Sequence, residues 1–327
     1  MAAWMTLNGT PPLVIAHRGA SGDRPEHTLA AYELAIALGA DYVEPDLVPT
    51  RDGVLVARHE NNLIDTTDVG DRPEFSDRYT TKQIDGQTCS GWFTEDFTLA
   101  ELKTLRVRER LPFRDQSFND RFQIPTWEEI LTLVRQSEQT TGRTIGIYPE
   151  TKHPSYFQSI GLPIEAPLLQ GLTDYGYGHP HDRICIQSFE TQNLQDLRSL
   201  TALPLIQLLG QATEIQVDSD RPYADLLTPE GLAAIAQYAQ GIGPDKRWIV
   251  PSHPTDVRQL LPPTDVVDRA HACGLWVHPY TFRNELQFLH PAYATPRQEY
   301  QQFFRLGVDA VFSDVPREAI AAREALA

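Results

Sequence analysis

The segment GADYVEPDLVPTRDGVLVARHE, residues 39–60, decides the fold that this sequence predicts. Its first part, residues 41–48, is a short and largely apolar run of the kind that forms a strand buried on both faces of a parallel sheet. The turn residues Thr50–Gly53 follow it, so we expect residues 54–59 to fold back beside the strand. A strand buried on both faces needs neighbouring strands and covering helices, and the rest of the chain supplies both.

Seven further short apolar runs recur along the chain, and a helical pattern follows each of them. The runs are residues 13–16, 145–148, 184–187, 205–209, 241–243, 275–278 and 310–312. Eight strands that alternate with helices predict an α/β fold, the (β/α)8 TIM barrel. An open, doubly wound sheet is the alternative, but no G-x-G-x-x-G follows the first strand, which disfavours a dinucleotide-binding fold.

Capping signals mark several of the expected helices. Thr126 with Glu129 forms a capping-box pattern, and Thr228 precedes a proline that suits the first turn of a helix. Residues 28–38 have apolar residues at helical spacing, and Gly39 follows them as a C-cap candidate. These signals fall between the predicted strands, as a barrel requires.

One region interrupts this alternation. From about residue 61 to 124 the sequence is polar and rich in turn residues, with one clear helix start at Thr98 and Glu101. We therefore expect a barrel formed by residues 1–60 and 125–327. Residues 61–124 are expected to form a small inserted domain after the second strand unit, folded over one end of the barrel.

Composition excludes several classes of protein. The 327 residues are 41% hydrophobic, and 28 Lys and Arg against 44 Asp and Glu give a net charge of −16. This charge argues against nucleic-acid and anionic-lipid partners, and no apolar run is long enough for a membrane helix, so we expect no stable membrane insertion. Three widely spaced cysteines fit neither a disulfide framework nor a zinc site. The N-terminus lacks a basic start and a long apolar run, which favours a cytoplasmic location, with a periplasmic one as the alternative if a signal was removed.

Polar residues cluster at one end of the predicted strands. Catalytic residues of TIM barrels lie at the C-terminal ends of the strands, and seven of the eight predicted strands end in polar residues, so we expect a polar pocket there. These residues are His17 and Arg18, Glu44 and Asp46, Glu150 and Lys152, Gln187, Gln207, His278 and Tyr280, and Asp314.

Two of these carboxylates, Glu44 and Asp46, are two residues apart, so on a strand they point to the same side. Two carboxylates about 4 Å apart repel by roughly 4 kcal/mol at an effective dielectric of 20, and a divalent cation or a shared proton removes that repulsion. Glu150 could complete an all-oxygen site, which suits Ca²⁺ or Mg²⁺. The alternative is that one carboxylate faces solvent or pairs with Arg18, Arg51 or Lys152.

Two histidines are candidates for proton transfer. His17 ends the first strand, and His59 ends the segment that folds back beside the second strand, so the two could approach each other. Two imidazoles can act as base and acid in one reaction cycle. Arg18 and Lys152 would supply positive charge for an anionic substrate. The alternatives are structural histidines and ordinary ion pairs to Glu44 or Glu150.

Five stretches together resemble the glycerophosphodiester phosphodiesterase family, most of all its larger bacterial, calcium-dependent type. They are HRGASGDRPEHTLAAY (17–32), the opening segment 39–60, IGIYPETKHP (145–154), GIGPDK (241–246) and VHPYTFR (277–283). The combination of HRG, PEHT, E-x-D, TRDG and HE at this spacing is highly specific. The resemblance spans nearly the whole chain.

The resemblance implies a (β/α)8 barrel with a small insertion and the hydrolysis of glycerophosphodiesters to sn-glycerol 3-phosphate and an alcohol, by way of a cyclic 1,2-phosphate. The implied substrates include glycerophosphocholine and glycerophosphoethanolamine, and the implied cofactor is a divalent cation, Ca²⁺ before Mg²⁺. The implied site consists of an acid/base pair, His17 and His59, three metal ligands, Glu44, Asp46 and Glu150, and two phosphate-binding residues, Arg18 and Lys152. Glu26 lies close to this centre in the family. Tyr280, at the catalytic end of the seventh strand, is the best candidate for a wall that contacts substrate.

Two other functions stay open at this point. A lyso-phospholipid phosphodiesterase would need an apolar rim that reaches lipid, for which Trp92-Phe93 is the candidate. A non-catalytic barrel that retains phosphate affinity is the other, and the intact motif residues argue against it. Direct attack of water on phosphorus is the alternative to the cyclic route, and the sequence is compatible with more than one head group and oligomeric state.

Overall fold

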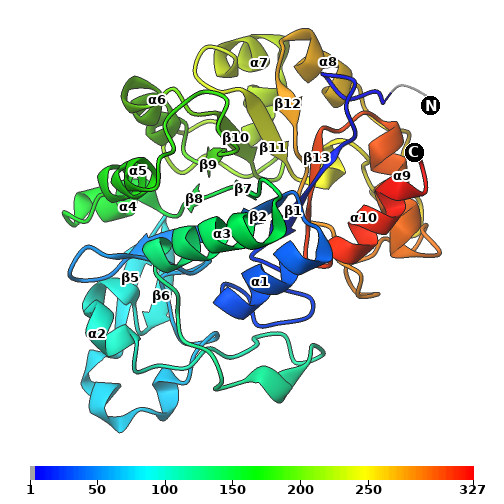
Figure 1. The fold of residues 1–327 in the computed structure, drawn as a ribbon. Helices are drawn as coiled ribbons and strands as arrows, with labels where there is room; N and C mark the ends of the chain where they lie inside the picture. Colours follow the sequence, from blue (N-terminus) through cyan, green and yellow to red (C-terminus); the bar gives the residue numbers. More distant parts are fainter. Residues whose placement is uncertain (1–3) are drawn as a thin grey trace.

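Eight parallel staves form a barrel in residues 4–327, the part of the chain that the computed structural model describes (Figure 1). Each stave lies beside the one that precedes it in the sequence, as in a TIM barrel. The staves are β1 (Leu13–His17), β2 (Tyr42–Glu44) with β3 (Asp46–Pro49), β7 (Gly146–Ile147) with β8 (Glu150–Thr151), β9 (Ile186–Ser188), β10 (Leu205–Leu209), β11 (Gly241–Pro244), β12 (Trp276–Val277) and β13 (Ala310–Ser313).

Backbone pairing closes the barrel. β1 pairs in parallel with both β2 and β13, so the first and last staves are neighbours. The second and third staves are each divided by a proline, but the Glu150 N–H still donates to the Pro45 carbonyl at 2.9 Å across them. Parallel bridges from Ile147 to Ile184 and from Phe282 to Ser313 join the remaining edges. The predicted barrel is confirmed, and the open sheet is excluded.

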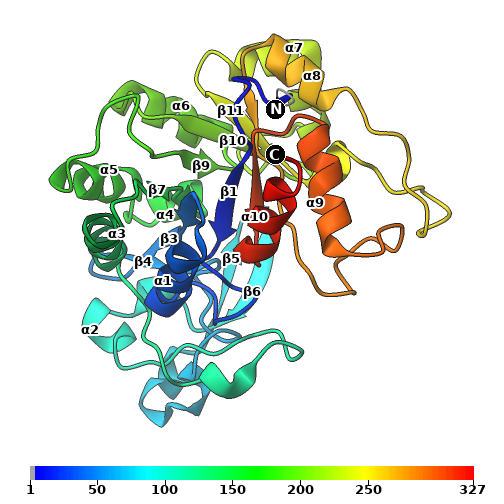
Figure 2. The same ribbon diagram turned by 45° about the vertical axis from the view of Figure 1, so that its right-hand side comes forward.

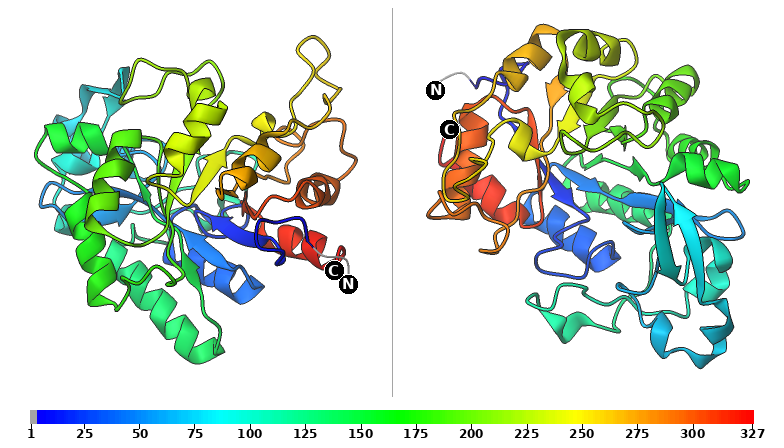
Figure 3. Two further views of the ribbon diagram at one scale, coloured as in Figure 1. Left: turned by 90° about the horizontal axis from the view of Figure 1, so that it is seen from above. Right: turned by 180° about the vertical axis from the view of Figure 1, so that it is seen from behind.

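An α-helix follows each stave and covers the outside of the barrel (Figure 3). The predicted capping box at Thr126 and Glu129 is present, and the Thr28 and Thr228 hydroxyls also cap helices. Among the described residues no helix is long and apolar enough to cross a membrane. The helices are α1 (Leu29–Leu38), α3 (Trp127–Thr141), α4 (Pro154–Ser159), α5 (Glu165–Asp174), α6 (Thr191–Leu200), α7 (Pro229–Ile235), α8 (Val266–Ala272), α9 (Pro296–Arg305) and α10 (Pro316–Glu324). Figure 2 shows α9 and α10 packed side by side next to β1.

Side chains inside the barrel change from apolar to polar along the strands. In β1, Val14 and Ala16 point outward into the core shared with the helices, whereas Ile15 packs inside the barrel. His17 lies two residues beyond Ile15 and therefore on the same face of its strand. Glu44 likewise lies two residues beyond the inward-pointing Tyr42. The apolar inner layer consists of Ile15, Tyr42, Tyr148, Cys185, Ile206, Ala310 and Phe312. The C-terminal end of the barrel interior is therefore polar.

The chain turns back after the second stave and then leaves the barrel. β4 (Leu55–Ala57) pairs antiparallel with β3, which confirms the predicted turn. Residues 61–124 follow, with a hairpin of β5 (Thr80–Ile84) and β6 (Gln87–Gly91) and the short helix α2 (Leu99–Leu102), in the lower part of Figure 1. Their apolar side chains join the same buried core as the outside of the barrel. The division of the chain into two domains at these boundaries stays a prediction.

One inward side chain, His278, is buried where the charged form of its ring is unfavourable. It is 4% exposed and lies below the polar end of the barrel, in a cavity of about 130 Å³ that Tyr148 and Trp276 also line. Its Nδ1 lies 2.8 Å from the Tyr148 hydroxyl. Burial lowers the pKa of His278 from 6.5 to about 4, because the charged imidazole loses its hydration.

We expect the replacement His278→Gln to flatten the pH dependence of stability. Between pH 6.5 and pH 4 the unfolded chain binds a proton at this histidine that the folded chain does not, so acid lowers the free energy of unfolding. The depressed pKa corresponds to about 3 kcal/mol, which the variant should no longer lose between pH 7 and pH 4. Urea unfolding over this pH range measures the difference, with His179→Gln, at an exposed loop histidine, as the control. Parallel curves for wild type and His278→Gln would contradict the assignment.

Candidate active site

A cavity of about 260 Å³ opens at the C-terminal end of the staves. It lies directly above the apolar inner layer, since Phe312 belongs to both. Its walls come from strand ends, from the loops that follow them and from residues 61–124, which contribute Arg110. The lining residues are His17, Arg18, Glu44, His59, Arg110, Glu150, Gln187, Phe189, Leu208, Tyr280, Thr281, Arg283 and Phe312.

The three predicted metal ligands come together at the base of this cavity. Glu44, Asp46 and Glu150 are buried, and each offers an oxygen within 4.8 Å of the others. β3 and β8 place Asp46 directly opposite Glu150, and the period of two along the second stave brings Glu44 to the same side. Sequence spacing could anticipate the first pair, and parallel pairing of neighbouring staves adds the third member.

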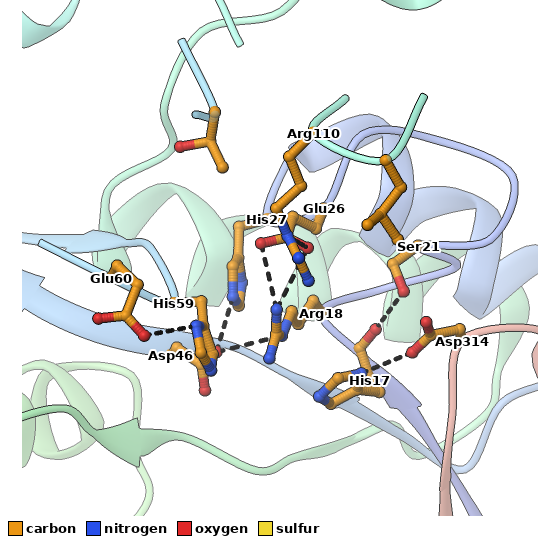
Figure 4. Close-up of polar contacts among 12 residues, drawn as sticks. His17, Arg18, Ser21, Glu26, His27, Asp46, His59, Glu60, Arg110 and Asp314 are labelled. Carbon is orange, nitrogen blue, oxygen red and sulfur yellow. Dashed lines mark hydrogen bonds and ion pairs between the residues drawn. The ribbon is translucent and has the colours of Figure 1, made fainter. Parts of the chain in front are cut away.

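Hydrogen bonds from neighbouring residues orient two of these carboxylates. The Arg18 backbone N–H donates to Glu44 at 2.7 Å, and the Gln187 side chain donates to the same carboxylate at 3.0 Å. His27 Nε2 lies 2.9 Å from Asp46 Oδ2 (Figure 4). The other oxygen of Asp46 is buried, with no hydrogen-bond partner among the described residues. An ionised oxygen held in this way fits a cation better than it fits an apolar interior.

The pKa shifts of the three carboxyl groups also favour a bound cation. Burial and the neighbouring Asp46 carboxylate raise the pKa of Glu44 well above its usual range, and burial raises that of Glu150 to about 8 although Lys152 opposes the shift. His27, Lys152 and Arg18 outweigh burial and hold the pKa of Asp46 well below its usual range. Ionising all three buried carboxyl groups at once therefore costs free energy unless further positive charge is present. A bound Ca²⁺ or Mg²⁺ would supply that charge, and both ions prefer oxygen ligands of this kind.

His17 is held by a carboxylate from the last stave. Its Nδ1 lies 2.6 Å from Asp314 Oδ1, and Arg114 and Arg283 bind the other oxygen of Asp314 at 2.5 and 3.2 Å. An ionised carboxylate requires Nδ1 to carry the proton, which leaves Nε2 for a molecule in the cavity. Burial and the Arg18 charge lower the pKa of His17 to about 4, against the pull of Asp314.

His59, which lies two residues after the end of β4, is also held by a carboxylate. Its Nδ1 lies 2.9 Å from Glu60 Oε1, and its side chain is 33% exposed (Figure 4). Burial of the ring and the charges of Arg18 and Lys152 lower the pKa of His59 to about 3. Both histidines therefore line one cavity, and each has its Nδ1 beside a carboxylate. The fold brings the two predicted histidines together as the returning strand suggested.

The two predicted phosphate-binding residues are paired with carboxylates. Arg18 Nη1 donates to both oxygens of Glu26 at 3.2 Å, and its Nε lies 3.5 Å from Asp46. Lys152 Nζ lies 3.0 Å from Glu150. Of the ion pairs that the sequence offered as alternatives, Lys152–Glu150 is present, whereas the Arg18 side chain pairs mainly with Glu26 rather than with Glu44. Both cations still border the cavity or its metal-ligand cluster.

Two of the polar strand ends do not contribute as predicted. Gln207 points outward, where its amide oxygen accepts hydrogen bonds from Thr191 and Tyr238 at 3.0 and 2.8 Å. The prediction that it joins the polar pocket is wrong, because the inward residues of β10 are Ile206 and Leu208. His278 points inward but lies in the smaller cavity below, so its assignment to the polar pocket is also wrong.

The aromatic candidates for substrate contact and for lipid contact lie in different places. Tyr280 lines the cavity, with its hydroxyl donating to the Leu209 carbonyl at 2.8 Å and its ring 6.0 Å from that of Phe189. Phe93 is fully buried in the core, and the Trp92 indole donates to the Phe75 carbonyl at 2.6 Å. The Trp92-Phe93 pair therefore does not form the exposed apolar rim that a lipid-binding enzyme would use.

Sequence reasoning missed several residues that support the site. The sequence marks Asp314 only as a polar strand end, although it holds His17 across 297 positions of sequence. Arg110 and Arg283 line the cavity from loops, where no periodicity predicts the direction of a side chain. The one usable signal was the position of Asp314 at the end of the stave next to β1.

The fold and the cavity together define a class: a TIM barrel with a charged cavity at the C-terminal ends of its strands, the place where enzymes of this fold bind their substrates. Sequence comparison identifies the family. The chain belongs to the Glycerophosphoryl diester phosphodiesterase family, whose sequence profile matches residues 17–318. Hydrolysis of glycerophosphodiesters is the activity that this membership establishes.

Individual relatives agree with this assignment. The chain is 40% identical to a glycerophosphodiester phosphodiesterase of Arabidopsis thaliana over 322 residues, which covers 94% of this chain and 85% of the relative. It is 30% identical to the enzyme of the same name from Haemophilus influenzae, over 93% and 87% of the two chains. Both similarities run through nearly the entire barrel and the insertion.

Solved structures share the fold. A phosphodiesterase of Oleispira antarctica, determined in complex with the product sn-glycerol-3-phosphate, superposes with a TM-score of 0.66 at 22% identity over 98% of this chain and 99% of that one. A solved structure from Silicibacter pomeroyi gives a TM-score of 0.68 at 22% identity, over 99% of this chain and 98% of that one. At this identity the similarity establishes the barrel fold.

Proposed function

We propose that this enzyme hydrolyses glycerophosphodiesters with small head groups, such as glycerophosphocholine and glycerophosphoethanolamine, with the help of a divalent cation. The observation that carries the proposal is the meeting, in one cavity of about 260 Å³, of two carboxylate-held imidazoles and the three-carboxylate cluster. A cavity of this size suits a glycerol phosphate with a small head group. The products are sn-glycerol 3-phosphate and the head-group alcohol.

Glu44, Asp46 and Glu150 are the proposed ligands of the cation. A cation bound there would polarise a phosphoryl oxygen and offset negative charge that develops on it. The three ligand oxygens lie within 4.8 Å of one another, close enough for one cation to reach all three, and an all-carboxylate set suits a hard ion with flexible coordination geometry. Ca²⁺ is therefore the proposed ion, with Mg²⁺ as the alternative.

His17 and His59 are the proposed acid/base pair. One imidazole takes the proton of the glycerol C2 hydroxyl as that oxygen forms a bond to phosphorus, and the other gives a proton to the alcohol oxygen as its bond to phosphorus breaks. The cyclic 1,2-phosphate formed in this way then opens with water, with the two histidines in exchanged roles. Asp314 and Glu60 hold a proton on each Nδ1, so that Nε2 of the neutral ring can act as the base. The ring that acts as the acid must carry protons on both nitrogens, and the adjacent carboxylate favours this charged form against the effect of burial.

The remaining cavity residues are proposed to bind the substrate. Arg18 and Lys152 supply positive charge for the phosphate, and the Tyr280 ring supplies an apolar face for glycerol or the head group. Two broader expectations stay predictions beside this proposal. They are a cytoplasmic location, with a periplasmic one as the alternative, and a separate domain at residues 61–124.

A comparison of two substrates tests the proposal against a lipid-directed activity. We expect release of glycerol 3-phosphate from glycerophosphocholine, and turnover of lysophosphatidylcholine at least tenfold slower, because Phe93 is buried and Trp92 packs against Tyr79 rather than facing lipid. A coupled assay for glycerol 3-phosphate, with a choline assay in parallel, measures both. Faster turnover of the lipid would favour the lyso-phospholipid enzyme, and binding of glycerophosphocholine without turnover would favour a non-catalytic barrel.

A further inference from the structure

A line of four side chains connects residues 61–124 to His59. His59 Nδ1 lies 2.9 Å from one oxygen of Glu60, and the other oxygen of Glu60 lies 3.2 Å from His153 Nε2. His153 Nδ1 in turn lies 2.5 Å from Asp85 Oδ2. Asp85 sits at the turn between β5 and β6, and His153 follows β8. The line therefore crosses from the hairpin, through the loop after the third stave, to the cavity.

His153 is placed to clamp both of its neighbours. Each ring nitrogen faces a carboxylate oxygen, and an imidazole can donate to two acceptors only when both nitrogens carry protons. Burial opposes that charge, but the hydrogen bonds to Asp85 and Glu60 raise the pKa of His153 to about 9. The side chain is 14% exposed, so solvent screens these contacts less than it screens a surface ion pair.

The backbone of both residues in the His153–Asp85 contact is in an unusual conformation. His153 and Asp85 each have φ of +48°, in the left-handed region that few residues other than glycine adopt. Asp85 and Gly86 form the two-residue turn of the hairpin, and an Asp-Gly pair with positive φ at both positions is the favoured sequence for such a turn. The turn thus holds the Asp85 carboxylate at a fixed place in front of His153.

The Glu60 side chain, which holds His59, is less restrained by its surroundings than Asp314, which holds His17. The Glu60 side chain is 53% exposed, whereas Asp314, which supports His17, is 2% exposed and bound by two arginines. A half-exposed glutamate has several rotamers of similar energy, and each loss of the His59 contact frees that ring to turn. A second contact from the partly buried, charged His153 restricts those rotamers.

We propose that Glu60 is a positioning residue for His59, and that His153 and Asp85 hold Glu60 in place, so that the β5–β6 turn supports the reaction from outside the cavity. This inference rests on the proposed acid/base role of His59. It assigns a function to the hairpin of residues 61–124, which makes this contact without itself lining the cavity. None of the three supporting residues is expected to bind substrate.

Glu60→Gln and Asp85→Asn test the line of contacts. Both keep the side-chain shape, and Asn tolerates the left-handed backbone at 85. We expect kcat to fall by roughly 10- to 100-fold in Glu60→Gln, because the amide places an N–H against one of two imidazole N–H donors, and several-fold in Asp85→Asn. KM for glycerophosphocholine and the melting temperature should stay near wild type. Asp120→Asn is the matched control, since Asp120 also has positive φ, at +63°, and pairs with Arg108 within the same segment.

The double variant Asp85→Asn, Glu60→Gln decides whether Asp85 acts through Glu60. If it does, Asp85→Asn should cost nothing further in the Glu60→Gln background, because coupled positions are not additive. Additive losses, an equal loss in Asp120→Asn, or a loss carried by KM or melting temperature would overturn the inference. A fully active His59→Ala would instead remove the proposed function on which it rests, so the two failures are distinguishable.

Discussion

Replacing either cavity histidine, in His17→Ala or His59→Ala, is expected to lower kcat for glycerophosphocholine by about 10² to 10⁴-fold, the range that general acid/base groups contribute. The physical reason is that each imidazole is the group in reach of the cavity with one nitrogen free and the other held by a carboxylate. KM should change far less, because neither ring carries the charge that binds the phosphate. Steady-state kinetics with the glycerol 3-phosphate assay measures both constants.

The control is His179→Ala, at an exposed loop position, which should turn over like wild type. A substrate with a p-nitrophenyl leaving group separates the two roles, since that group departs without a proton. The variant that lacks the acid should recover most of its rate on this substrate, and the variant that lacks the base should not. Near-normal turnover by both alanine variants on glycerophosphocholine would end the proposed mechanism.

The fold could be read from the sequence because its signals are local. Each stave is a short apolar run, several helices begin after a threonine cap, and Thr126 with Glu129 caps α3 as its spacing predicts. The direction of side chains within a stave is less local. β10 is buried along its whole length, so no alternation of polar and apolar residues tells which face is inward. Gln207 was misplaced for this reason.

The site was predictable where the chain itself sets the geometry. Glu44 and Asp46 share a side because they are two residues apart on one stave, and His59 returns because the turn before β4 is only a few residues long. Contacts that form only when the barrel closes could not be predicted in this way. Asp314 reaches His17 because the last stave pairs with the first, which no local pattern encodes.

Removal of divalent cations is expected to lower turnover by at least about 100-fold, and Ca²⁺ should restore it better than Mg²⁺. Loss of several kcal/mol of charge stabilisation at a phosphoryl oxygen accounts for a factor of this size. Turnover of glycerophosphocholine after EDTA treatment and gel filtration, with each ion added back, is the measurement. Unchanged turnover in the chelated protein would contradict the role proposed for Glu44, Asp46 and Glu150.

Thermal stability gives a readout of the same cluster that does not depend on activity. A cation that binds only the folded protein stabilises it by about 2.7 kcal/mol at a concentration of 100 Kd, so Ca²⁺ should raise the melting temperature of wild type. Glu150→Gln should lose most of this gain, yet melt close to wild type in EDTA at pH 7, because burial raises the pKa of Glu150 to about 8 and the metal-free carboxyl is already largely neutral, as the amide is. Glu165→Gln, at a buried glutamate bonded to Gln158 and Asn193, should keep the full gain. An equal gain in Glu150→Gln would place the cation elsewhere, since a site of three carboxylates cannot lose one charge without losing affinity.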